Sequence, residues 1–168
     1  MEAAAMDDRT VKVYYGEGKG KSALSLGRAL VCAGEGKSVF VIQFLKGRMS
    51  GKLDYLKKYE PDIKVFRFEK NDCYYEELSE EERLEEDINI RNGLNFARKV
   101  LKIGECDVLI LDEVLGLVDL GIIKCEDLIS MINLEGEGAE LIMTGITLPQ
   151  DLVPYADYIY CLDVTKQP

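Results

Sequence analysis

The sequence of 168 residues contains no histidine and no tryptophan. Without histidine the chain lacks the usual general base, the partner of serine and cysteine nucleophiles, and the commonest ligand of transition metals. Its five cysteines are odd in number and form no C-x-x-C pair, which argues against a zinc site and against a disulfide framework. Any chemistry must therefore depend on carboxylates, lysines and bound ions.

The sequence also lacks a long apolar run and an excess of positive charge. No stretch approaches the roughly 18 apolar residues of a spanning helix, and residues 1–8 have no features of an export signal. We therefore expect a cytoplasmic protein that binds no membrane. The net charge of −10 opposes nucleic-acid binding, but residues 9–52 carry nine Lys or Arg against two Glu. That segment is either a site for a small polyanion or an ordinary solvated basic face.

The length fits one domain, in which strand-like and helix-like segments alternate. We expect strands over 11–15, 38–44, 64–68, 108–111, 141–144 and 158–162. We expect helices after residue 22, from residue 79 and over 124–133. This order predicts an α/β fold with a mainly parallel central sheet, helices on both faces, and ligands at the carboxyl ends of the strands. Residues 9–168 would form this single domain, and residues 1–8 a disordered N-terminus.

Two of the expected helices have recognisable details. The first carries apolar residues at helical spacing, namely Leu26, Ala29, Leu30 and Ala33. The second opens with a capping box of Ser79 and Glu82. Its buried face would be Ile90, Leu94, Ala97 and Leu101. We interpret the acidic residues at its start as a solvated turn that suits the helix dipole, with no site: Glu80, Glu81, Glu82, Glu85 and Glu86.

A glycine-rich segment lies between the first expected strand and the first helix. Its residues are Gly16, Glu17, Gly18, Lys19, Gly20, Lys21 and Ser22. In a phosphate-binding loop the glycine backbone and the helix N-terminus bind the anion, the lysine reaches the phosphates, and the serine hydroxyl binds Mg²⁺. The alternative is a turn that caps a helix and binds nothing. The loop is one residue shorter than the common G-x-x-x-x-G-K-[ST] pattern, so we expect altered phosphate contacts.

An acidic pair, Asp112 and Glu113, directly follows the expected strand 108–111. In a parallel sheet this position lies at the edge where the glycine-rich loop also lies. Carboxylates there can hold Mg²⁺ directly or through water. The alternative is an acidic turn at the end of a strand.

Taken together, these residues resemble the ATP:corrinoid adenosyltransferases of the cob(I)alamin type. The segments that carry the resemblance are 16–22, 41–47, 110–113, 144–145 and 156–157. It runs in order from Val11 to Pro168. It implies a recombinase-like α/β fold, usually a homodimer, that moves the adenosyl group of ATP to the reduced cobalt of a corrinoid and releases triphosphate.

The resemblance also implies roles for individual residues. The nucleotide would be bound by Gly16, Glu17, Gly18, Lys19, Gly20, Lys21 and Ser22. Mg²⁺ would be held by Ser22 with Asp112 or Glu113, and Lys21 and Glu113 would act in catalysis. Tyr74 and Tyr75 would lie near the corrinoid or would simply pack. ATP and a corrinoid would be the substrates, and a reductase that supplies electrons would be a further partner.

The sequence departs from the family pattern in three places. Ile146 stands where many relatives have arginine, and Asn71–Tyr75 replaces a segment that often contains tryptophan. The sequence ends at Pro168, where relatives continue with a basic, glycine-containing tail. Two other functions therefore stay open. Asp112 and Glu113 could serve a water-using ATPase, or the chain could bind a nucleotide or a corrinoid without catalysis.

Overall fold

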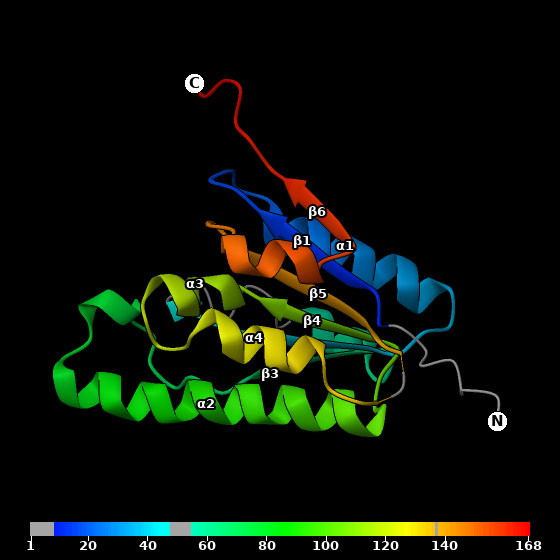
Figure 1. Ribbon diagram of the computed structural model, residues 1–168, viewed down its shortest axis with the longest axis horizontal. Helices are drawn as coiled ribbons and strands as arrows, with labels where there is room; N and C mark the ends of the chain where they lie inside the picture. Colours follow the sequence, from blue (N-terminus) through cyan, green and yellow to red (C-terminus); the bar gives the residue numbers. More distant parts are fainter. Residues whose placement is uncertain (1–8, 48–54, 137) are drawn as a thin grey trace.

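The strands form one sheet in which all neighbouring pairs are parallel. The computed structural model describes residues 9–47, 55–136 and 138–168. In sheet order the strands are β3 (Ile63–Arg67), β2 (Val39–Gln43), β4 (Val108–Asp112), β5 (Glu140–Gly145), β1 (Val11–Tyr15) and β6 (Tyr158–Cys161) (Figure 1). The predicted α/β fold is thus confirmed. The predicted disorder of residues 1–8 lies outside the described residues.

Helices cover both faces of this sheet (Figure 1). One face carries α1 (Lys21–Gly34), and the other carries α2 (Glu80–Ile103), α3 (Val114–Asp119) and α4 (Cys125–Ile132). The 3₁₀ helices η2 (Tyr75–Glu77) and η3 (Gln150–Tyr155) lie in the connections. Within the described ranges, no helix is both long enough and apolar enough to cross a membrane.

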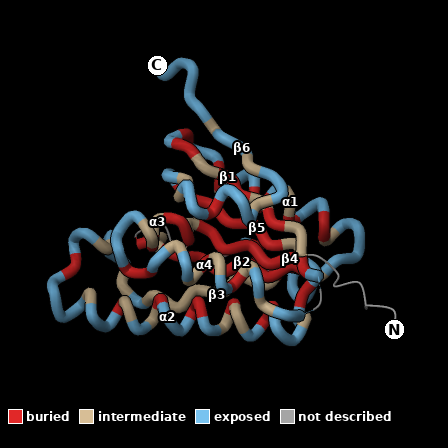
Figure 2. Tube along the Cα trace, in the orientation of Figure 1, coloured by how far each residue is buried: buried red, intermediate tan, exposed pale blue. Residues whose placement is uncertain are grey.

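The strand β4 shows how the sheet builds a core on each face. All of its residues are buried, as expected for a central strand with helices on both sides (Figure 2). Because side chains alternate along a strand, Leu109 and Leu111 pack with α2, α3 and α4, whereas Val108 and Ile110 pack with α1. The continuous apolar runs in the sequence therefore correspond to strands buried on both faces.

The long helix α2 begins as its sequence predicts. The Ser79 hydroxyl accepts a hydrogen bond from the Glu82 N–H, and the Glu82 carboxylate accepts one from the Ser79 N–H. The helix ends at Gly104, which has a left-handed conformation. The predicted buried face is confirmed, because Ile90, Leu94, Ala97 and Leu101 are all buried. In α1, by contrast, Leu30 is 42% exposed although Leu26 and Ala29 are buried.

The helix α3 is not among the helices expected from the sequence. It directly follows β4 and buries Val114, Leu115 and Leu117 against the sheet. Its close packing requires a glycine in β5, because a Cβ on Gly145 would lie 2.4 Å from the Cβ of Leu115. A helix of six residues shows too little periodicity to be distinguished from the end of an apolar strand.

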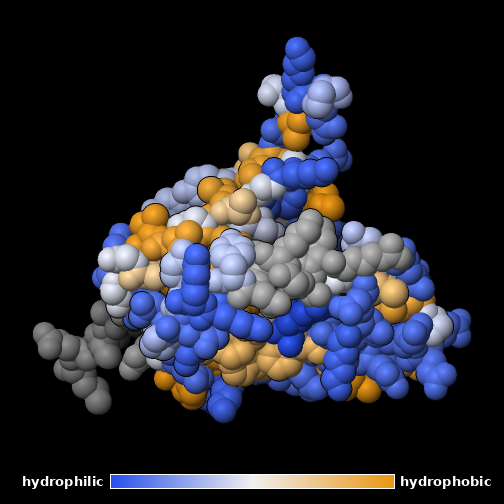
Figure 3. Space-filling view, turned by 180° about the vertical axis from the view of Figure 1, so that it is seen from behind, coloured by the Kyte–Doolittle hydropathy of each residue, from blue (hydrophilic) through white to orange (hydrophobic). Residues whose placement is uncertain are grey.

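The register of the sheet brings the carboxyl ends of the central strands to one edge. Tyr15 of β1 pairs with Gly145 of β5, and Gln43 of β2 pairs with Asp112 of β4. The loops that follow these strands therefore meet at the same edge. The segment after β6 projects from the body of the protein near this edge (Figures 1 and 3).

Candidate nucleotide site

The glycine-rich loop between β1 and α1 turns sharply at two glycines. Gly16 and Gly20 have φ angles of 127° and 124°, which residues with a side chain rarely adopt. A Cβ on Gly16 would lie 2.2 Å from the carbonyl oxygen of Leu162, so this approach requires glycine. The Gly16 N–H donates to the Ile146 carbonyl over 3.0 Å, and the Gly18 N–H donates to the Leu162 carbonyl over 3.4 Å. The segments after β5 and β6 therefore hold the loop in its curved shape.

The side chain of Lys21 lies inside this curve. Lys21 is only 7% exposed, and its ammonium donates to the carbonyls of Gly16 over 2.7 Å and of Gly18 over 2.9 Å. An ammonium has three donors, so these two bonds leave one for a phosphate oxygen. The loop thus fixes the position of the Lys21 ammonium, the group that the sequence predicts to bind phosphate.

A buried carboxylate joins the loop to the centre of the sheet. Asp112, 1% exposed, accepts a hydrogen bond on Oδ1 from the Ser22 hydroxyl over 3.0 Å. The same oxygen accepts one from the Thr144 hydroxyl over 2.8 Å. These bonds fulfil the prediction that the glycine-rich loop and the acidic pair converge. Thr144 belongs to a segment that carries the family resemblance, but its role as a partner of Asp112 was not predicted.

A second lysine completes this cluster. The ammonium of Lys46, from the loop after β2, lies 2.8 Å from Asp112 Oδ2 and donates to the Ser22 hydroxyl over 3.1 Å. Lys46 belongs to the segment 41–47 that carries the family resemblance, but no role was predicted for it. Lys46 lies near Asp112 because β2 and β4 are neighbours in the sheet. That strand order is set by tertiary contacts, so the local sequence does not predict it.

The neighbouring carboxylate, Glu113, has a different environment. Its backbone is left-handed, with φ of 63°, and its N–H donates to the Thr144 hydroxyl over 2.9 Å. Burial raises the pKa of its carboxyl, and the positive charges of Lys46 and Lys21 partly oppose that increase. Asp112 therefore contacts the loop through hydrogen bonds, whereas Glu113 lies beside it in the field of two lysines.

The oxygen atoms at this edge fit a magnesium ion, which prefers hard oxygen ligands. The Ser22 hydroxyl donates its hydrogen bond to Asp112, so its lone pairs face cations, and one of these, the Lys46 ammonium, already donates to it. The buried Oδ2 of Asp112 already pairs with the positive charge of Lys46. Among the described residues, no group of three or more His, Cys, Asp or Glu side chains could hold a metal ion. The Ser22 hydroxyl and the Asp112 carboxylate are the protein oxygens that would hold Mg²⁺ here, with phosphate oxygens as further ligands.

The two tyrosines proposed for the corrinoid have different surroundings. Tyr75 donates from its hydroxyl to Asp87 over 2.7 Å, and the guanidinium of Arg83 lies 5.6 Å from its ring centre. Burial and this hydrogen bond raise the pKa of Tyr75 to about 12. Tyr74 is 42% exposed and lies against Gly47, where a Cβ would approach its ring to 3.2 Å. Tyr74 is therefore the more accessible of the two.

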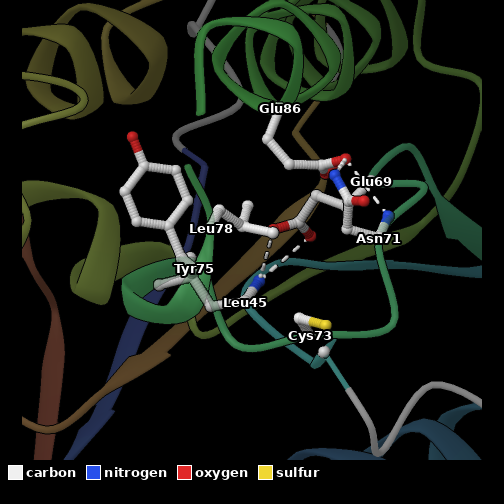
Figure 4. A pocket seen from close by; sticks show the side chains of 8 residues that line it. Leu45, Glu69, Asn71, Cys73, Tyr75, Leu78 and Glu86 are labelled. Carbon is white, nitrogen blue, oxygen red and sulfur yellow. Dashed lines mark hydrogen bonds between the residues drawn. The ribbon is translucent and has the colours of Figure 1, made fainter. Parts of the chain in front are cut away.

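A pocket beside Tyr75 is lined by two carboxylates, of the half-buried Glu69 and the buried Glu86 (Figure 4). Glu69 accepts hydrogen bonds from the Leu45 N–H over 2.9 and 3.0 Å. Burial raises the pKa of Glu69 to about 7; the Leu45 bond opposes this shift, and the charge of Glu86 adds to it. The Glu69 carboxylate thus holds the start of the loop that carries Lys46.

Glu86 corrects one interpretation of the acidic helix start. Its place in a run of glutamates predicts a solvated side chain, yet Glu86 is only 2% exposed. Its carboxylate accepts from the Lys70 N–H over 2.9 Å and from the Asn71 N–H and side-chain amide over 3.2 and 3.0 Å. It therefore fixes the segment before the tyrosines. Sequence alone does not distinguish it from its solvated neighbours, because only contacts with a distant segment bury it.

Comparison with known proteins assigns this chain to a family. The family model described as ATP:corrinoid adenosyltransferase BtuR/CobO/CobP matches residues 7–168. The chain belongs to this family. It is 26% identical over 159 residues to the corrinoid adenosyltransferase of Escherichia coli K12, covering 94% of this chain and 78% of that protein. It is 27% identical, with the same coverage, to the corrinoid adenosyltransferase CobA of Salmonella typhimurium LT2.

A third relative, an uncharacterized protein of Nostoc, is 29% identical over 161 residues, which are 88% of this chain and 42% of that protein. The family confirms the resemblance stated from the motifs, and it identifies this adenosyltransferase-family chain as an enzyme of the transferase class. Ile146, where the resemblance predicts an arginine, is 53% exposed. Its carbonyl accepts the hydrogen bond from the Gly16 N–H.

Proposed function

We propose that this chain transfers the adenosyl group of ATP to the reduced cobalt of a corrinoid and releases triphosphate. Membership of the adenosyltransferase family supports the reaction class. The observation that carries the proposal is the convergence of Lys21, Ser22 and Asp112 at the mouth of the phosphate loop. These groups suit a reaction in which the whole triphosphate chain departs.

The absence of histidine is compatible with this reaction. The substrate's cobalt supplies the electron pair that forms the bond to the ribose 5′-carbon, so the protein needs no nucleophile and no general base. As that bond forms, the bond between the carbon and the triphosphate oxygen breaks, and the electrons leave with triphosphate. The protein must position the carbon and neutralise the charge that develops on the departing oxygen.

The residues of the site divide this work. Lys21 would direct its third donor to a phosphate oxygen, and the amides at the start of α1 would bind the anion. Ser22, with its proton held by Asp112, would hold Mg²⁺ together with the nucleotide. When bound, Mg²⁺ would neutralise phosphate charge. Glu113 would lie close enough to the two lysines to influence the same charges.

The corrinoid would lie near the tyrosines. We propose Tyr74 as the ring that covers one face of the cobalt, because it is the exposed member of the pair. A ring in that place excludes water without offering a strong ligand. Tyr75 would fix the segment through Asp87. The homodimer, the reductase partner and the cytoplasmic location stay predictions.

Product analysis tests this proposal against the alternatives. The protein should be incubated without oxygen with ATP, Mg²⁺ and a reduced corrinoid, and the phosphate products separated. We expect triphosphate in an amount equal to the adenosylcorrinoid formed. Orthophosphate without a change in the corrinoid would instead support an ATPase. Binding of ATP without either product would support a non-catalytic binding protein.

A further inference from the structure

The side chain of Lys46 lies where the proposed function places the metal ion. Its ammonium is 2.8 Å from Asp112 Oδ2 and 3.1 Å from the Ser22 hydroxyl. Those two groups are the protein's own oxygens for Mg²⁺ in the proposed site. Only 14% of the Lys46 side chain is exposed, so little water separates these charges. A lysine cation and a magnesium ion cannot both contact the same oxygens.

The backbone that carries Lys46 is held on both sides. Leu45 has a left-handed backbone, with φ of 55°, and its N–H is bound by both carboxylate oxygens of Glu69 (Figure 4). Gly47, with φ of 43°, lies so close to Cys73 that a Cβ would come within 2.8 Å of its carbonyl oxygen. Movement of the ammonium therefore requires rotation of the side chain rather than a shift of the loop.

The electrostatics favour an exchange of cations. Asp112 is 1% exposed, and an unpaired carboxylate at such a depth is strongly unfavourable. The ammonium of Lys46 provides the required positive charge, and a divalent ion at the same oxygens would provide more. Once replaced, a lysine on a fixed backbone still ends near the site, where a triphosphate offers several anionic oxygens.

We propose that Lys46 occupies the metal position of the nucleotide site, that Mg²⁺ displaces its ammonium from Asp112 and Ser22, and that the ammonium then binds the triphosphate. This inference rests on the proposed function, since it requires ATP to bind at the glycine-rich loop. It assigns Lys46 a role that differs from that of Lys21. Lys21 is bound to the carbonyls of the loop and does not contact Asp112 in the described structure.

The test is the factor by which Mg²⁺ increases the affinity for ATP. Calorimetry should measure ATP binding with excess Mg²⁺ and with a chelator, for wild type and for Lys46→Met. Without metal, the variant should bind ATP more weakly, because no cation offsets Asp112. With metal, no ammonium has to be displaced, which offsets the loss of the contact between the ammonium and the triphosphate. We expect the factor to be at least about tenfold larger in Lys46→Met than in the wild type.

Several results would contradict this assignment. If Lys46 only binds phosphate or only supports the fold, the ATP affinities with and without Mg²⁺ change together. The factor by which Mg²⁺ increases the affinity then stays the same, and this result would overturn the proposal. Lys37→Met, which removes a lysine from an exposed pair with Glu35, is the matched control and should leave the factor unchanged. If Lys46→Met does not fold, Lys46→Gln removes the same charge but keeps a donor for Asp112. A wild type that binds no ATP would refute the proposed function itself.

Discussion

Ser22 and Asp112 are 90 positions apart in the chain, yet the hydroxyl of one donates to the carboxylate of the other over 3.0 Å. This bond joins the phosphate loop to β4, and it depends on the parallel register that brings the carboxyl ends of the strands together. It also fixes the direction of the hydroxyl proton. The serine therefore presents lone pairs to a cation rather than a donor.

Changing the acidic pair should separate the roles of its two members. Asp112→Asn removes the negative charge that faces Ser22 and Lys46, so it should abolish most of the Mg²⁺ dependence of ATP binding. Glu113→Gln should have the smaller effect, because Glu113 lies beside this cluster and its bond to Thr144 comes from the backbone. Calorimetry over a series of Mg²⁺ concentrations measures both. Wild-type Mg²⁺ dependence in both variants would contradict the metal assignment.

Removal of the loop lysine should weaken nucleotide binding. Lys21→Ala loses a charge-assisted phosphate contact worth about 1.5–3 kcal/mol, which corresponds to at least about a tenfold loss of ATP affinity. Lys37→Ala, at the surface, is the control. Circular dichroism must show that the variant is folded, because Lys21 also binds two loop carbonyls. A folded variant with unchanged affinity would refute the phosphate-loop assignment.

Tyr74 and Tyr75 should differ in their effect on the corrinoid. Electron paramagnetic resonance of the divalent corrinoid with wild-type protein and ATP should show loss of the lower axial ligand. Tyr74→Ala should retain that ligand and slow adenosylation, with ATP affinity nearly unchanged. Tyr75→Phe keeps the ring and loses only the bond to Asp87, so it should resemble the wild type. If the wild-type spectrum equals that of free corrinoid, the tyrosine assignment is wrong.

Glu69 should make stability depend on pH. Its pKa is raised from 4.5 to about 7 in the folded protein, chiefly by burial, so the folded state binds its proton more tightly than the unfolded state does. The contribution of Glu69 to the free energy of unfolding is therefore lost as pH rises from about 4.5 to about 7, by a total of about 3 kcal/mol. Glu86, Arg67 and Lys46 also act on this carboxyl.

Urea unfolding of the wild type and of Glu69→Gln at several pH values isolates the contribution of Glu69 to the free energy of unfolding. The contributions of the other titrating groups cancel in the difference between the two proteins. The amide that replaces the carboxylate is uncharged, and its oxygen can still accept from the Leu45 N–H. The stability of the variant relative to the wild type should therefore rise between pH 5 and pH 8. A difference that does not change with pH would show that burial of Glu69 does not shift its titration.

The sequence was sufficient for features that depend on local pattern. The apolar run at 108–111, the capping box at Ser79 and the glycine-rich loop all appear in the structure close to their expected bounds. Each is encoded by neighbours within a few residues. The convergence of Ser22 with Asp112 was also predictable, because parallel sheets place such loops at one edge.

Features that depend on tertiary contacts were not predictable. Lys46 reaches Asp112 because β2 lies beside β4, and no local pattern encodes that neighbour. Glu86 looks like the solvated glutamates around it, and only its bonds to Lys70 and Asn71 bury it. The exposure of Leu30 has the same origin, since helical spacing does not show which side of α1 faces the sheet.

The central claim is that this chain joins the adenosyl group of ATP to a corrinoid at the loop containing Lys21. The most direct measurement is the absorption spectrum of a reduced corrinoid, kept without oxygen, after addition of ATP, Mg²⁺ and protein. We predict conversion to the spectrum of the adenosylated form with wild-type protein, and strongly slowed conversion with Lys21→Ala. A spectrum that stays that of the reduced corrinoid, with a wild-type protein shown to bind ATP, would contradict the claim.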